Sequence, residues 1–179
     1  LDYLNFTLLG ARFMLIYMYR FTDAIRKSTQ DENWFAALFL ALCLPDICGA
    51  LETPEENTDV RYKRWFNANL AQQYSPMFSA EDCYYFRCSC LHQGLDKHNR
   101  LSHERIHFIT PPPNKSIVHR NKLNNVLQMQ IDIFCTDMAD AVDNWYENTA
   151  KSSTTIQERI NDIIKIYGPE SLQPFIVFG

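Results

Sequence analysis

The run from Trp34 to Leu44 constrains what this chain can fold into more than any other segment. All eleven of its residues are apolar, so a helix formed by them would be apolar on every side. Such a helix predicts an almost fully buried position at the centre of a helical bundle. The run is too short to span a bilayer and Pro45-Asp46 interrupts it, so we expect no membrane partner. Pro45 also predicts a kink, because it removes one backbone donor.

The composition fits one globular domain over residues 1–179. Hydrophobic residues make up 46% of the sequence and charged residues 21%, which excludes a largely disordered or fibrous chain. Only 5 glycines are present, and no glycine-rich phosphate loop, zinc-protease motif or serine-hydrolase motif occurs. The 6 cysteines lie mostly in apolar stretches. We therefore expect free, buried thiols in a cytoplasmic protein without a signal peptide.

Apolar periodicity predicts an all-α (mainly α) fold, a helical bundle of about six helices with a small β-hairpin insertion near 104–120. One helix has clear signals at both ends, because Ser79 precedes Glu81-Asp82 and Gly94 follows its last apolar residues. The expected helices span about 2–27, 31–51, 59–73, 80–93, 127–145 and 155–168.

The hairpin is expected from alternating residues over 104–110, a rigid turn at Pro111-Pro112-Pro113 and a returning strand over 116–120. Asn125 and Gln128 are predicted to cap the long helix that follows. That helix carries an apolar seam of residues spaced three and four apart: Leu127, Ile131, Phe134, Met138, Ala141 and Trp145. Few charges lie on the seam and the tail over 173–178 is apolar, so we expect a homodimer.

Basic residues are concentrated in residues 97–122. This segment holds six basic residues and one acid, whereas the whole chain has a net charge of −4, and it contains four of the five histidines. A basic segment in a mildly acidic protein predicts a local anion site. The candidate phosphate or RNA ligands are Arg100, Arg105, Arg120 and Lys122. A solvated hairpin that is basic by chance is the alternative.

Arg87 lies within an otherwise apolar helix, and His92 follows it five positions later. A guanidinium group presents a fixed set of donors that suits phosphate, and a histidine titrates near neutral pH. The two residues are therefore candidate catalytic residues for cleavage of an RNA phosphodiester. His92 would move the proton and Arg87 would stabilise the charge of the phosphorane, without a metal or another cofactor.

The motif Arg87-x-x-x-x-His92, its apolar helix and the long helix after the hairpin resemble the HEPN superfamily. The resemblance implies an α-helical domain, and in many members a metal-independent ribonuclease in which two motifs meet at a dimer interface. Active members often carry a polar residue directly after the arginine, where this chain has Cys88. The alternative is a non-catalytic interaction module of the same fold, for example in a toxin–antitoxin or phage-defence system.

The motif residues also have structural interpretations. Arg87 would be a core arginine paired with a buried acid such as Asp46, Asp132 or Asp137. His92 would bind free carbonyl groups at a helix C-terminus, where the dipole favours a cation. A metal site is not expected, because the cysteines near His92 point in several directions on one helix and have no zinc-ligand spacing.

Overall fold

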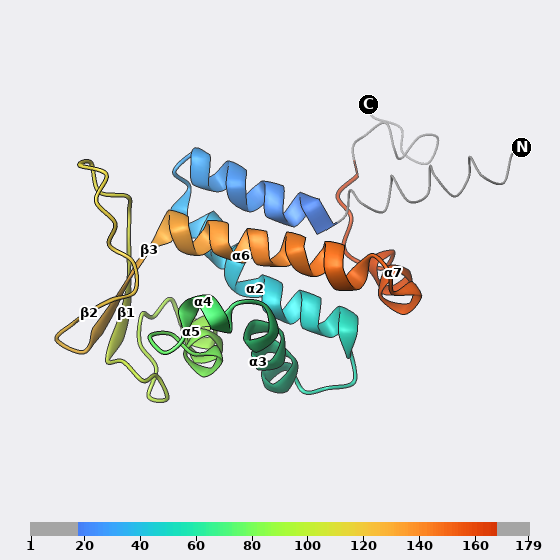
Figure 1. Ribbon diagram of the computed structural model, residues 1–179, viewed down its shortest axis with the longest axis horizontal. Helices are drawn as coiled ribbons and strands as arrows, with labels where there is room; N and C mark the ends of the chain where they lie inside the picture. The colour runs from blue at the N-terminus through green and yellow to red at the C-terminus, as the bar shows by residue number, and fades with distance from the viewer. Residues whose placement is uncertain (1–17, 168–179) are drawn as a thin grey trace, which may run out of the picture.

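The computed structural model describes residues 18–167, which form a mainly helical protein with a small three-stranded sheet. Figure 1 shows helix 18–30, α6 and α2 lying alongside one another, with the sheet at one end and α7 at the other. The elements after helix 18–30 are α2 (Trp34–Glu52), α3 (Thr58–Asn69), α4 (Ala71–Tyr74), α5 (Ala80–Gln93), β1 (Arg105–Ile109), β2 (Asn121–Leu123), β3 (Val126–Gln130), α6 (Ile131–Trp145), the π-helical turn η1 (Tyr146–Ala150) and α7 (Thr154–Ile160).

Helix α2 is the centre of the fold, because it packs against α3, α5, α6 and α7. The prediction that Trp34–Leu44 is almost fully buried is wrong, since Phe35 is 75% exposed and Phe39 is 38% exposed. These two rings lie one turn apart on the side of α2 that no described element covers, and they contact each other edge to face. By length and composition α2 could cross a membrane, but half of it is buried as in a core helix.

Helices α3 and α4 form where one helix was expected over 59–73. The chain breaks regular helix at Leu70 and resumes at Ala71. Tyr62, Trp65 and Phe66 are buried, and the hydroxyl of Tyr62 donates to the carbonyl of Leu42 on α2 and contacts the thiol of Cys83 on α5. The short distance between α2 and α3 depends on Gly49, because a Cβ atom there would lie 2.9 Å from the carbonyl oxygen of Arg61.

Helix α5 begins and ends where the sequence predicted. The hydroxyl of Ser79 accepts from the backbone of Asp82, and the carboxylate of Asp82 accepts from the backbone of Ser79. Gly94 closes the helix with a left-handed φ of 67°. Asp82 also accepts from the backbone and hydroxyl of Ser102. Burial opposes ionisation of Asp82, but these hydrogen bonds outweigh it and lower the pKa of the carboxyl group.

The expected hairpin over 104–120 is wrong in its pairing. Strand β1 runs parallel to β3, and β2 is antiparallel to β3, so the strand order is β1-β3-β2. The tight turn lies between β2 and β3 at Asn124 and Asn125, whose φ angles are 48° and 63°. Asparagine tolerates this left-handed conformation better than most residues, and two such residues are typical of hairpin turns.

Helix α6 carries the predicted apolar seam only from Ile131 to Trp145, all of whose seam residues are buried. Leu127 lies in β3, and Asn125 and Gln128 do not cap α6, because its N-cap position is Gln130 without a side-chain cap. Helix α7 ends at Ile160, earlier than expected. The apolar tail over 173–178 and most of the first expected helix lie outside the described residues.

His119 attaches the segment before β2 to the rest of the protein. Its Nδ1 atom accepts from the backbone N–H of Gln130 at 3.2 Å, and its ring contacts the ring of Tyr74 edge to face. The Nε2 atom is buried without a partner among the described residues. Burial lowers the pKa of His119, and the carboxylates of Asp137 and Asp132 oppose this effect only in part.

We predict that Gly49→Ala destabilises the protein by about 1–3 kcal/mol, because α3 must move away from the new methyl group. A helical glycine-to-alanine change would otherwise stabilise by roughly 0.5–1 kcal/mol. Urea denaturation measures the difference. Gly94→Ala is the control, since nothing lies within 4 Å of its added Cβ and its cost of about 1 kcal/mol comes from φ alone. A Gly49→Ala protein as stable as the wild type would contradict the close approach.

We predict that the protein loses stability as pH falls below about 6.5, the ordinary pKa of histidine. The folded state keeps His119 neutral, so the unfolded state binds the additional proton first, and acidification favours unfolding. Chemical denaturation at pH 7, 6 and 5 measures this slope. His119→Asn keeps an acceptor near the Nδ1 position without titrating, so its slope should be smaller. An equal slope in both proteins would exclude His119 as the cause.

Candidate functional site

Arg87 lies at the junction of three helices. Its Nη2 atom donates to Oδ2 of Asp46 on α2 at 3.3 Å, and Arg61 on α3 donates from Nε to Oδ1 of the same carboxylate at 2.8 Å. The three side chains are 16%, 19% and 18% exposed for Arg87, Asp46 and Arg61. Of the three acids that the sequence offered as partners, Asp46 is therefore the one that pairs with Arg87, and Asp137 instead accepts from Tyr74.

The carboxylate of Asp46 does not neutralise this junction. It faces two guanidinium groups, so the three side chains together carry one net positive charge. The Nε atom of Arg87 is buried without a partner among the described residues. Burial opposes the charge on Arg87, but contacts with the Cys88 thiol and with Asp46 outweigh it and raise the pKa of Arg87. The partly exposed guanidinium group suits an anion such as phosphate, but its buried Nε atom is not accessible to one.

His92 does not lie beside Arg87 in one chain. Helix α5 stays regular to Gln93, so two residues five positions apart point about 140° from each other. Arg87 points to α2 through its contact with Asp46, whereas His92 is exposed and makes no hydrogen bond with the described residues. The described chain therefore brings Arg87 together with Asp46 and leaves the imidazole of His92 accessible to solvent.

The four candidate phosphate ligands have different neighbours. Arg100 donates to the hydroxyl of Tyr85 at 2.8 Å and lies over its ring. Arg105 pairs with Asp96 at 2.6 Å. Arg120 donates to the carbonyl of Gln73 and lies over the ring of Tyr74, and Lys122 is exposed on β2. None of the four contacts Arg87 or His92, so one chain does not assemble the predicted site around the motif.

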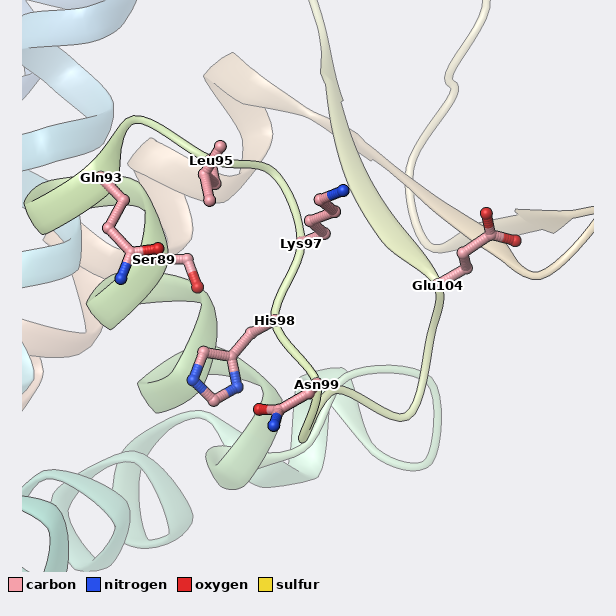
Figure 2. A pocket seen from close by; sticks show the side chains of 7 residues that line it. All are labelled: Ser89, Gln93, Leu95, Lys97, His98, Asn99 and Glu104. Carbon is pink, nitrogen blue, oxygen red and sulfur yellow. The ribbon is translucent and has the colours of Figure 1, made fainter.

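A cavity of about 540 Å³ lies beside the C-terminal half of α5. Its lining comes from α5 and from the segment that follows it: Ser89, Gln93, Leu95, Lys97, His98, Asn99 and Glu104 (Figure 2). Neither Arg87 nor His92 lines it. The basic segment 97–122 was recognised from the sequence, but this cavity was not predicted. Gly94 was the available signal, because a chain reversal there returns the segment toward the helix.

The cysteines and histidines form no metal centre within residues 18–167, where no three residues of the metal-binding types lie together. All six cysteines have free thiols. Burial raises the pKa of Cys83 and of Cys135 to about 12, so both thiols stay protonated and unreactive near neutral pH. His103 is buried and its Nε2 atom lies 2.7 Å from the carbonyl of Met77, which gives it a structural role.

Comparison of the chain with protein-family models, with curated protein sequences and with solved structures returned no match.

We predict that substitutions at the three-helix junction destabilise in the order Asp46→Ala, Arg61→Ala, Arg87→Ala. Removing Asp46 leaves two guanidinium groups facing each other and should cost about 2–4 kcal/mol, less than a fully buried pair because the site is partly exposed. Removing Arg87 leaves the shorter Arg61 contact intact and should cost about 1 kcal/mol. Urea denaturation measures all three. A loss of stability with Arg87→Ala as large as with Asp46→Ala would make Arg87 a mainly structural residue.

Proposed function

We propose that this protein is a HEPN-like helical bundle that binds RNA as a homodimer. The observation that carries the proposal is the junction of Asp46, Arg61 and Arg87, which keeps one net positive charge on three side chains that are each partly exposed. Phosphate is the anion that a guanidinium group recognises best along an RNA chain. The basic residues of 97–122 would add attraction over a longer range.

A homodimer would complete the site. Phe35, Phe39, Cys43 and Ile47 are partly or largely exposed on α2 at intervals of four residues, which places them along one side of the helix. This stripe passes next to Asp46, and through it next to Arg87. Pairing of two copies across the stripe would cover its apolar surface. It would also place the Arg87 of one chain where the His92 of the other can approach.

The chemistry that we propose is cleavage of an RNA phosphodiester by the adjacent 2′-hydroxyl. The imidazole of His92 is exposed, and an imidazole can take the proton of the 2′-hydroxyl or give one to the leaving oxygen. Arg87 would hold the charge that develops on the phosphorane. The free thiols fit a reducing compartment such as the cytoplasm.

A second candidate function is a non-catalytic interaction module that pairs with itself or with another protein. The observation that favours it is the contact between Arg87 and Asp46, since an arginine held by a carboxylate is less free to follow a reacting phosphate. Cys88, in the position directly after Arg87, favours it as well.

We predict that the protein cleaves a mixed RNA in the presence of EDTA and that Arg87→Ala and His92→Ala each abolish cleavage. A mixture of the two variants should recover about a quarter of the wild-type activity, because half of the re-formed dimers contain one intact composite site out of two. Gel analysis of labelled RNA measures the rate. No recovery in a mixture shown to exchange subunits would exclude a site shared between chains.

The controls separate cleavage, binding and assembly. Phe39→Glu should give a monomer in light scattering and lose cleavage, since a charge on the α2 stripe opposes pairing. RNA binding by the wild type should weaken steeply with salt, because each phosphate contact releases counterions. If the wild type binds RNA without cleaving it, and His92→Ala binds RNA equally well, the result would support the non-catalytic module. No binding of RNA at any salt concentration would overturn the RNA proposal.

A further inference from the structure

The cavity between α5 and the segment 95–104 has the features of a small-molecule site that the motif does not explain. Its volume of about 540 Å³ lies within the usual range for ligand pockets. In Figure 2 the side chains of Ser89 and His98 point toward each other across the space between α5 and the segment. Lys97 projects toward β1, and the carboxylate of Glu104 projects away from the other lining residues.

Three polar side chains of the cavity are unused. The amides of Gln93 and Asn99 and the ammonium group of Lys97 make no hydrogen bond or ion pair with any residue of 18–167. Each amide offers a donor and an acceptor next to each other. That pattern matches the edge of a nucleobase, and such amide–base pairs are a common means of base recognition.

The segment that carries these groups is fixed before a ligand arrives. The His98 ring stacks on the Tyr85 ring at 4.9 Å with an angle of 12° between the planes. Its Nδ1 atom accepts from the backbone N–H of Arg100, so the neutral imidazole carries its proton on Nε2. Asp82 holds the backbone of Ser102 at the far end of the segment. A site ordered in advance loses less entropy on binding.

The charges around the cavity favour a base inside it and a phosphate outside it. The C-terminal end of α5 carries partial negative charge, which disfavours a phosphate in the interior. Leu95 and the His98 ring provide the apolar surface that a base needs. Lys97 and the exposed Arg100 would contact a phosphate at the rim of the cavity.

We infer that this cavity binds one nucleobase of an RNA chain whose phosphate contacts Arg87 and His92, an inference that rests on the proposed function. Gln93 directly follows His92 in α5, so a base in the cavity would lie near the phosphodiester at which His92 is proposed to transfer a proton. The amides of Gln93 and Asn99 would then select the nucleotide next to the cleaved bond. The substrate class is single-stranded RNA, because only an unpaired base can enter.

The test titrates the full chain with each of the four ribonucleoside 5′-monophosphates and with inorganic phosphate, and follows the ring signals of Tyr85 and His98 by NMR. At least one nucleotide should shift both signals, and by more than inorganic phosphate does, since phosphate alone would reach only Lys97 and Arg100 at the rim. Gln93→Ala and Asn99→Ala should each weaken binding of that nucleotide about tenfold. Gln72→Ala, an exposed amide on α4, is the matched control and should bind as the wild type does. Circular dichroism checks that each variant is folded.

Arg87→Ala separates this inference from the proposed function. It should leave binding of the corresponding ribonucleoside, which has no phosphate for Arg87 to contact, unchanged while it removes binding of RNA. RNA binding without nucleotide binding would overturn the inference and leave the proposed function in place. Ribonucleoside binding that Arg87→Ala abolishes, or nucleotide binding that neither amide substitution weakens, would also overturn it, because the base would then bind elsewhere. If neither nucleotides nor RNA bind, both the inference and the proposed function fail.

Discussion

The carboxylate of Asp46 is the interaction on which the arrangement of the helices depends. Before its last residue, helix α2 contains no other charged side chain, and a carboxylate inside an apolar helix is costly unless it is paired. Arg61 from α3 and Arg87 from α5 both pair with it. One carboxylate therefore joins three helices, and Gly49 one turn later lets the backbone of α3 approach closely enough for the contact.

Elements with local signals could be predicted from the sequence, and elements that depend on distant residues could not. Both ends of helix α5 are set by residues that flank it directly, because the hydroxyl of Ser79 caps its start and Gly94 closes its end. Strand β3 pairs in parallel with β1, which lies about twenty residues earlier in the chain. A local sequence pattern does not predict which distant strand will be the partner. Leu127 also fits the apolar spacing of the α6 seam, so this position was predicted as helix although it lies in β3.

The candidate site divides in the same way. The sequence indicated a buried acid as the structural partner of Arg87, with Asp46 among the examples, because a cation in an apolar helix needs a carboxylate. It could not choose Asp46, since that choice depends on how α2 crosses α5. The angle of about 140° between the side-chain directions of Arg87 and His92 follows from their spacing in the sequence alone. The cavity beside Gln93 did not, because its walls come from a segment whose path is fixed by Asp82 and Ser102.

The junction also explains why stability and recognition would be linked in this protein. A single arginine on Asp46 would give a neutral pair, well suited to a core but with little attraction for an anion. The second arginine leaves the three side chains with a net positive charge, and it shares the carboxylate at the longer distance of 3.3 Å. Arg61 thus supplies most of the structural contact. That division leaves Arg87 as the more weakly held cation, the one that the proposed phosphate contact would use.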